Sequence, residues 1–264
     1  MSNETGTNKS PGPPNLSILL TGASGSLGRA LALQHAASGV NFHIWGRDAD
    51  RLDETAHSLS NRGARVVTTS FDLADTLGAV HEMIEQDQTE RFDIAYFVAG
   101  TGETRASKDR VEAPDLVARA VTTNFAAPAA MAAALADRMV ERGKGRIVLI
   151  GSAAGHHSLP FASAYSGSKA GLARFSDALR LAVRPFGVSV TLAAPGFLDT
   201  PHARAEAKVP PFLLSVDEAA RRIVRAGENG ARHYVTPWPF RALRSVDGIL
   251  PAPLRDAILS RLGK

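Results

Sequence analysis

Residues 16–29 read LSILLTGASGSLGR, an apolar run that passes directly into a glycine-rich turn and then into a segment with helical periodicity. A turn of this kind lets backbone N–H groups approach a phosphate, and the N-terminus of the following helix adds its positive dipole end. A tight turn that binds no ligand is the alternative. Because the pattern occupies the first strand–helix turn of the chain, we interpret it as a nucleotide-binding loop.

Outward from this loop, short aliphatic runs alternate with longer amphipathic segments, and continuous apolar runs such as Ile147–Ile150 are typical of strands covered on both faces. The alternation predicts an α/β fold, a single-domain Rossmann-like doubly wound parallel sheet of about seven strands with helices on both faces. The expected strands are Leu16–Leu20, Phe42–Trp45, Arg65–Ser70, Ile94–Val98, Arg146–Ile150, Val188–Ala193 and His233–Val235. The expected helices include Leu27–Ala37, Ala49–Asn61, Thr76–Gln86, Pro114–Arg142, Ala164–Arg184 and Val216–Gly227.

The 264 residues fit one domain of this type, since such sheets often reach this length. Residues 1–15 are polar and rich in proline and lack the apolar segment of a signal peptide, so we expect a disordered N-terminal tail. The dinucleotide-binding domain is expected over residues 16–237, and residues 238–264 are expected to form a C-terminal amphipathic extension of it.

The composition excludes several classes of function. The chain has no cysteine, which rules out disulfides, thiolate metal sites and a cysteine nucleophile, and which fits a cytoplasmic location. The longest apolar run, Phe125–Ala136, is too short to span a bilayer. The 30 basic and 26 acidic residues leave a net charge of +4 without a dense basic block, so we expect no nucleic-acid partner. Adjacent His156 and His157 have no acidic neighbour, and we expect no metal site.

The end of the second expected strand bears on the choice of nucleotide. A carboxylate there would accept a hydrogen bond from the ribose of NAD, whereas a guanidinium favours the extra phosphate of NADP. Gly46-Arg47 therefore favours NADP(H) over NAD(H), with Arg29 as a second cation. Asp48 leaves two alternatives, a cap of the next helix or a strand end misplaced by a residue or two. Asp72, after the third strand, either accepts from the adenine amine or caps a helix.

A second set of residues suits proton transfer. Tyr165 and Lys169 stand four residues apart on one face of an expected helix, although such a pair alone is more often a solvated face. Ser152 ends the fifth strand, and Asn124 lies inside a long helix, where an amide is unfavourable unless it forms hydrogen bonds. Taken in order from about Leu16 to Pro237, the motifs resemble the short-chain dehydrogenase/reductase family. They are Thr21–Gly28, Ala99-Gly100, Asn124, Ser152, Tyr165 with Lys169, and Pro195-Gly196 followed by Thr200.

The resemblance implies an oxidoreductase that moves a hydride between a nicotinamide cofactor and a ketone, aldehyde or alcohol. Tyr165 would be the general acid/base, with Lys169 lowering its pKa from about 10 toward about 7 and holding the nicotinamide ribose. Ser152 would bind the substrate oxygen, and Asn124 would help hold a water in a proton relay. The cofactor-binding residues expected on this basis are Gly22, Ser24, Ser26, Leu27, Gly28, Arg29, Arg47, Asp72, Leu73, Ala99, Gly100, Tyr165, Lys169, Pro195, Gly196, Leu198 and Thr200.

Two positions depart from the family pattern. Ser26 stands where the family has its middle glycine, and Phe97-Val98 replaces two asparagines that pin neighbouring strands. These departures support an alternative function, a non-catalytic dinucleotide-binding regulatory or scaffold protein of the same fold. An epimerase that uses its bound cofactor internally is a further alternative, against which the short substrate region argues. Aliphatic and aromatic residues after Gly155 and over residues 197–214 suggest an apolar carbonyl substrate.

The resemblance also bears on partners. Members of the family form dimers, often onward to tetramers, through helices that correspond to Ala126–Ala136 and the Tyr165 helix, so we expect a homodimer or homotetramer. Packing of these helices against the sheet is the alternative. The basic amphipathic extension 238–264 suits peripheral contact with a membrane, although a cap over the pocket or a subunit contact is the favoured interpretation.

Overall fold

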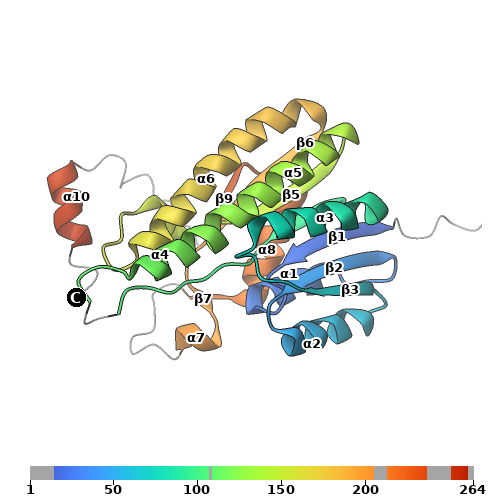
Figure 1. Ribbon diagram of the computed structural model, residues 1–264, viewed down its shortest axis with the longest axis horizontal. Coiled ribbons are helices and arrows are strands. Elements are labelled where there is room, and N and C mark those ends of the chain that lie inside the picture. Colours follow the sequence, from blue (N-terminus) through green and yellow to red (C-terminus); the bar gives the residue numbers. More distant parts are fainter. Residues whose placement is uncertain (1–14, 107–108, 205–212, 237–250, 261–264) are drawn as a thin grey trace, which may run out of the picture.

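Seven parallel strands form one sheet in the order β3-β2-β1-β4-β5-β6-β9 (Figure 1). The computed structural model describes residues 15–106, 109–204, 213–236 and 251–260. The strands are β1 (Leu16–Thr21), β2 (Val40–Gly46), β3 (Arg65–Ser70), β4 (Ile94–Phe97), β5 (Gly145–Ile150), β6 (Val188–Pro195) and β9 (His233–Thr236). The strand order reverses between β1 and β4, and a parallel sheet binds its ligands in the crevice at the carboxyl ends of such strands.

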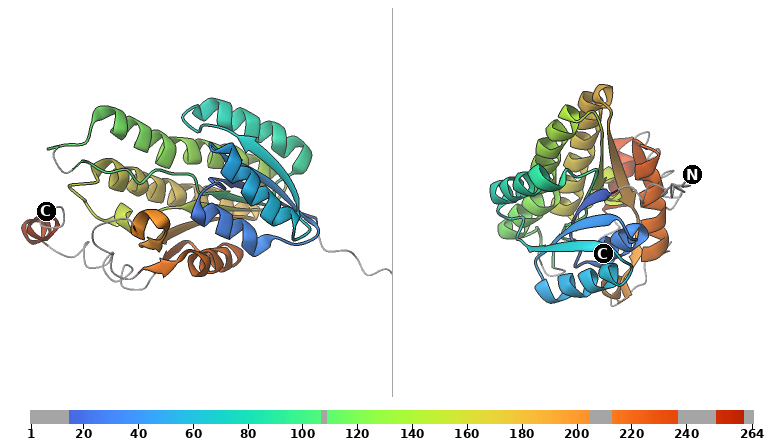
Figure 2. Two further views of the ribbon diagram at one scale, coloured as in Figure 1. Left: turned by 90° about the horizontal axis from the view of Figure 1, so that it is seen from below. Right: turned by 90° about the vertical axis from the view of Figure 1, so that its right-hand side faces the viewer.

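Helices cover both faces of this sheet (Figures 1 and 2). One face carries α1 (Ser26–His35), α2 (Ala49–Ser60) and α8 (Val216–Glu228), and the other carries α3 (Thr76–Glu90), α5 (Ala127–Glu141) and α6 (Ser163–Val183). Ile18 and Leu20 contribute to the core on the first face and Leu19 to the core on the second. Successive strand residues point to opposite faces, so the continuous apolar runs fill two cores at once.

The doubly wound α/β fold predicted from the sequence is confirmed, and every predicted strand ends within two residues of the observed bounds. The expected helix over residues 114–142 differs. It consists of α4 (Pro114–Val121), a π-helical segment η1 (Thr122–Ala126) and α5. The sequence pattern did not predict five short elements: η2 (Ala153–His156), η3 (Arg184–Phe186), β7 (Leu198–Asp199), α7 (Pro201–Arg204) and β8 (Leu214–Ser215).

The expected C-terminal extension is described only in part, as α10 (Ala252–Leu259). This helix follows Pro251 and carries Pro253 in its first turn, where a missing N–H removes no helical hydrogen bond. The segments 237–250 and 261–264, and the expected N-terminal tail except Asn15, lie outside the described residues. Within the described part of the chain, no helix has the length and apolar character needed to cross a membrane.

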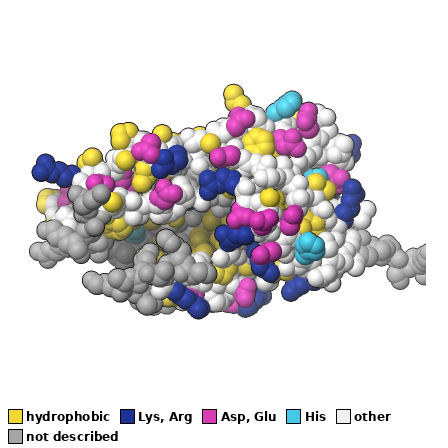
Figure 3. Space-filling view, turned by 60° about the horizontal axis from the view of Figure 1, so that its bottom comes forward, with side chains coloured by type: hydrophobic (Ala, Val, Ile, Leu, Met, Phe, Trp, Pro, Cys, Tyr) yellow, Lys and Arg dark blue, Asp and Glu magenta, His cyan; other side chains and the backbone are white. Residues whose placement is uncertain are grey.

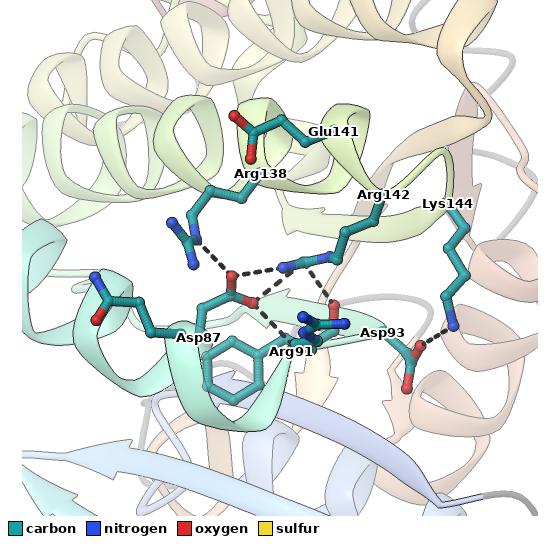
Figure 4. A pocket seen from close by; sticks show the side chains of 9 residues that line it. Asp87, Arg91, Asp93, Arg138, Glu141, Arg142 and Lys144 are labelled. Atoms are coloured by element: carbon teal, nitrogen blue, oxygen red, sulfur yellow. Dashed lines mark hydrogen bonds and ion pairs between the residues drawn. The ribbon is translucent and has the colours of Figure 1, made fainter.

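A buried carboxylate joins the two helices of one layer at the amino end of the strands (Figure 4). Asp87 of α3 is fully buried and accepts hydrogen bonds from Phe92 N at 2.9 Å and from Arg142 Nη1 at 2.6 Å, and it also forms an ion pair with Arg138. These side chains line a cavity of about 580 Å³ together with Arg91 and other polar residues. Because the surrounding donors already satisfy Asp87, we interpret this cluster as a clasp between α3 and α5, away from the crevice.

Candidate active site at the carboxyl edge of the sheet

The glycine-rich loop between β1 and α1 packs too closely for side chains at two positions. A Cβ on Gly22, whose φ is +74°, would lie 2.7 Å from Ala99 N. A Cβ on Gly28 would lie 2.2 Å from Gly22 O. The loop therefore lies directly against the end of β4, and α1 begins immediately behind the loop, which leaves backbone N–H groups for a phosphate.

Ser26, which departs from the family glycine, is the first residue of α1. Arg91 is the one non-glycine residue with a positive φ among those the structure describes, so Ser26 has ordinary right-handed backbone geometry. A glycine is not required at this position for conformational reasons. The Ser26 side chain is partly exposed and lines the crevice.

The crevice has a volume of about 300 Å³ and opens over β1, β2, β3 and β4. Eleven of the predicted cofactor residues line it: Gly22, Ser24, Ser26, Leu27, Gly28, Arg47, Asp72, Leu73, Ala99, Gly100 and Thr200. Thr21, Gly25 and Gly46, which belong to the motifs named from the sequence, also line it. Sequence reasoning did not assign Trp45, Phe71, Val98 and Thr123 to the cofactor site. The tilted Trp45–Phe71 pair, with ring centroids 5.5 Å apart, gives the crevice an aromatic wall.

Charged residues at the end of β2 have separate roles. Asp48 caps α2 by accepting a hydrogen bond from Arg51 N at 3.1 Å, so its carboxylate is used locally. The cap interpretation of Asp48 is therefore confirmed, and β2 also ends at Gly46, one residue beyond the expected strand end. Arg47 lines the crevice, whereas Arg29 donates to Ser58 Oγ at 3.1 Å and is not brought to the crevice. On the face drawn in Figure 3, Lys and Arg side chains are interspersed with Asp and Glu.

Asp72 and its neighbour Leu73 lie on the far wall of the crevice. Asp72 accepts a hydrogen bond from Ala74 N at 3.0 Å, which forms a tight turn after β3. The cap of α3 is Asp75, which accepts from Gly78 N at 3.0 Å. The alternative interpretation of Asp72 as the helix cap is therefore wrong, because Asp75 has that role.

Thr21 replaces the strand-pinning function of the absent asparagines. Its Oγ1 accepts hydrogen bonds from Val98 N at 3.1 Å and from Ala99 N at 3.4 Å, so it ties the end of β1 to the segment after β4. Phe97, at the end of β4, is 2% exposed and belongs to the core. Phe97 and Val98 stand where the family has two asparagines. The backbone at Val98 and Ala99 is nevertheless held by the Thr21 hydroxyl.

Asn124 lies in the π-helical segment η1 and is fully buried. Its Oδ1 accepts from Thr101 N at 2.8 Å, and its Nδ2 donates to Thr101 O at 3.0 Å and to Ser168 Oγ at 3.2 Å. These bonds supply the partners that an amide inside a helix requires. The π-helical turn is where α4 and α5 meet, and it directs the amide toward the end of β4 and the helix α6.

Lys169 of α6 lies close to Asn124. Its Nζ donates to Ile150 O at 2.8 Å, and burial lowers the pKa of this ammonium to about 8. A Cβ on Gly100 would lie 2.8 Å from Asn124 Oδ1 and 3.4 Å from Lys169 Nζ. Asn124 and Lys169 therefore converge beside Gly100, a residue that also lines the crevice.

Tyr165 lies one helical turn before Lys169 in α6, and Ser152 follows β5, where its Oγ accepts from Ala154 N at 3.1 Å. Burial raises the pKa of the Tyr165 phenol above its ordinary value of about 10, and the Ser152 side chain opposes this effect. Lys169 donates to Ile150 O in this arrangement, and its expected effect on the pKa of Tyr165 with a cofactor bound stays a prediction.

The comparisons with known proteins agree with this geometry. The family model described as short chain dehydrogenase matches residues 17–209. The chain belongs to the short-chain dehydrogenase family. An uncharacterized oxidoreductase from Myxococcus xanthus is 31% identical over 246 residues, which cover 92% of this chain and 96% of that protein. A solved short-chain dehydrogenase from Sphingobium yanoikuyae in complex with NADPH has a TM-score of 0.77 at 27% identity, covering 88% of this chain and 93% of its own.

A further relative is longer than this chain. Dehydrogenase/reductase SDR family member 7B from Bos taurus is 34% identical over 195 residues. The match covers 70% of this chain and 59% of that relative. This short-chain dehydrogenase therefore matches about three fifths of the length of that protein.

The remaining predicted residues of this short-chain dehydrogenase lie where β6 ends. Pro195 is the last residue of β6, and Gly196 N donates to Thr236 O at 2.7 Å, which joins the strand end to β9. Leu198 belongs to β7, which pairs with β8. Thr200 Oγ1 accepts from Ala203 N at 3.2 Å and lines the crevice. Of the loop expected to border the substrate, residues 205–212 lie outside the described part.

Proposed function

We propose that this short-chain dehydrogenase is an NADP(H)-dependent enzyme that interconverts a ketone or aldehyde with an alcohol. The observation that carries the proposal is that Asn124 and Lys169 meet beside Gly100, which lines the crevice. Lys169 Nζ bonds to Ile150 O, two residues before Ser152, and the Ser152 side chain acts on the pKa of Tyr165. A phenol next to a hydroxyl can protonate a developing alkoxide and can accept the proton in reverse.

A dinucleotide fits the residues that are present. The loop is tightly packed at Gly22 and Gly28, and the crevice that it borders extends to Gly100. Backbone groups of the loop would hold the pyrophosphate, and the aromatic wall and Asp72 would border the adenosine. When bound, the nicotinamide supplies the hydride. The NADPH complex of the Sphingobium yanoikuyae relative supports this cofactor.

Each of the four side chains has a distinct part in the proposed reaction. Ser152 donates to the substrate oxygen and orients it toward the phenol of Tyr165, which transfers the proton. Lys169, with a pKa of about 8, titrates near neutral pH and can pass a proton onward. Asn124 holds the Thr101 backbone and Ser168 in place behind Lys169, where a relay water would be bound.

The preference for NADP(H) is tested by titration with NADPH and NADH, followed through nicotinamide fluorescence. Arg47 is the cation that lines the crevice where the extra phosphate would lie, so Arg47→Ser is expected to weaken NADPH binding roughly 10- to 100-fold and to leave NADH binding unchanged. Arg29→Ser is the matched control, because Arg29 bonds to Ser58 instead. Tighter binding of NADH by the unmodified protein contradicts the proposal.

Catalysis is tested separately with Tyr165→Phe in an assay of NADPH oxidation against a panel of ketones. This variant is expected to lose turnover and to retain NADPH affinity within about twofold, because the ring stays and only the proton donor is removed. Equal turnover by the variant and the unmodified protein contradicts the assignment of Tyr165. Binding of NADPH without turnover of any carbonyl by the unmodified protein favours the regulatory alternative.

The substrate proposed for this site is an apolar carbonyl compound. Its support is the apolar character of the two segments expected to border the substrate, which contain Phe161 after Gly155 and Phe197, 45% exposed, after Gly196. The proposed assembly is a homodimer or homotetramer. Apolar side chains are exposed on α4 and α6 at Val121 and Leu181, and the mass of the protein in solution tests this.

A further inference from the structure

Glu112 is a buried carboxylate close to the first turn of the helix that carries Tyr165. It lies just before α4 and is 8% exposed. Its Oε2 accepts hydrogen bonds from Ala164 N at 2.7 Å and from Ser163 Oγ. Glu112 therefore connects the start of α4 to the start of α6. Its partner Ala164 is the residue immediately before Tyr165.

The first turn of α6 has no cap from its own sequence. The cap position is occupied by Ala162, which has no side-chain hydrogen bond, and the first turn contains no acidic residue. The first N–H groups of a helix have no partner within the helix, and its N-terminus carries partial positive charge. The Glu112 carboxylate satisfies both requirements from a different part of the chain.

Two further bonds connect the same segments. Arg105 N donates to Phe161 O at 3.1 Å before α6 begins, and Asn124 Nδ2 donates to Ser168 Oγ at 3.2 Å one turn later. Arg105, Glu112 and Asn124 thus form hydrogen bonds to three successive positions along α6 and the residues just before it: Phe161, Ala164 and Ser168. Tyr165 lies between Ala164, which Glu112 contacts, and Ser168, which Asn124 contacts.

We propose that Glu112 is a positioning residue for Tyr165. The carboxylate anchors the first turn of α6 and thereby fixes the phenol beside Ser152. The inference rests on the proposed function, because it assigns a role in the reaction of Tyr165. Misplacement of a reacting group by an ångström costs as much as 100-fold in rate, so a loosened first turn is expected to slow turnover. The glycine-rich loop between β1 and α1 does not contact this turn in the hydrogen bonds described, so NADPH affinity is expected to be retained.

The test compares Glu112→Ala, which removes the acceptor, with Glu112→Gln, which keeps an oxygen at the same reach. We expect Glu112→Ala to lower kcat roughly 10- to 100-fold with NADPH affinity within twofold of the unmodified protein. Glu112→Gln is expected to retain kcat within about threefold, because the amide oxygen still accepts from Ala164 N. Asp115→Ala is the matched control. Asp115 lies on the neighbouring first turn of α4, is 69% exposed and pairs with Arg119, so its kcat is expected to be unchanged.

Amide hydrogen exchange of the peptide that covers residues 159–168 provides a readout independent of turnover. Faster exchange in Glu112→Ala, and unchanged exchange in Glu112→Gln and Asp115→Ala, is expected. If Glu112→Ala fails to fold, Glu112→Asp takes its place, since its shorter side chain keeps the charge but falls short of Ala164 N. Unchanged kcat in the shortened variants, or an equal loss in Glu112→Gln, overturns the proposal. Lack of turnover by the unmodified protein refutes the proposed function, and the exchange experiment still tests the anchor.

Discussion

The close contact at Gly28 provides a sharp test of how the nucleotide loop is built. In Gly28→Ala, the new Cβ would lie 2.2 Å from Gly22 O, more than an ångström closer than the ordinary contact limit of 3.4 Å. Both groups belong to the backbone, so no side-chain rotation relieves the contact. The loop must move away from α1, or the first turn of α1 must open.

The expected magnitude follows from two opposing effects. Overpacking of this kind costs typically 1–3 kcal/mol, and the gain in helix propensity from glycine to alanine offsets about 1 kcal/mol of it. A net loss of up to about 2 kcal/mol in the free energy of unfolding is therefore expected. Because the displaced loop is the one proposed to hold the pyrophosphate, the NADPH dissociation constant is expected to rise at least tenfold.

Gly167→Ala is the matched control, because it makes the same substitution inside another helix. Gly167 of α6 is exposed, and nothing lies within 4 Å of its Cβ position. It is expected to stabilise the protein by about 0.5–1 kcal/mol and to leave NADPH affinity unchanged. Urea unfolding and NADPH titration of both variants provide the measurement. Equal stability and affinity of Gly28→Ala and the unmodified protein would refute the reasoning.

Three other variants test the physical interpretation of the fold. Asp87→Ala leaves Arg138 and Arg142 without their buried partner and is expected to lower the free energy of unfolding by about 3 kcal/mol in urea, with NADPH affinity unchanged. Arg91→Gly relieves the left-handed φ of 49° at the C-cap of α3 and is expected to raise thermal stability by about 0.5–1 kcal/mol; a lower melting temperature would contradict this. The Arg232 hydrogen bond lowers the pKa of Asp177 from 3.8 to about 2, so its stabilisation is complete above the unfolded pKa and is lost as pH falls from about 5 to 2. Asp177→Asn should flatten that part of the stability profile by up to about 2 kcal/mol, and identical profiles would exclude the pair as its cause.

The sequence predicted the sheet well because its central strands are buried on both faces, although the edge strand β3 is not. Runs such as Ile147–Ile150 must be apolar throughout, and this signal is independent of distant contacts. The glycine loop was predicted for a similar reason, since Gly22 and Gly28 are required by contacts within ten residues of the chain or with the adjacent strand. The four candidate catalytic residues were found through the order of motifs, and their convergence needed the fold.

Other features depend on partners that are far away in the sequence. Asn124, in the π-helical turn, forms hydrogen bonds to Thr101 and Ser168. Local periodicity does not identify either of these residues as its partner. Glu112 reads as an ordinary acidic residue before a helix, and its partner Ala164 N lies 52 residues later. Local sequence patterns report propensity and burial, whereas such long-range bonds are decided by how the elements pack.

The two departures from the family pattern have physical explanations that weaken the non-catalytic alternative. Ser26 adopts right-handed geometry at the start of α1, so the absent glycine costs no strain, and its hydroxyl faces the crevice. Thr21 bonds to Val98 N and Ala99 N, so the absent asparagines leave no loose strand end. Neither departure lies among the side chains proposed for proton transfer, which are Asn124, Ser152, Tyr165 and Lys169. The departures therefore bear on how the chain holds its nucleotide loop and leave those four side chains in place.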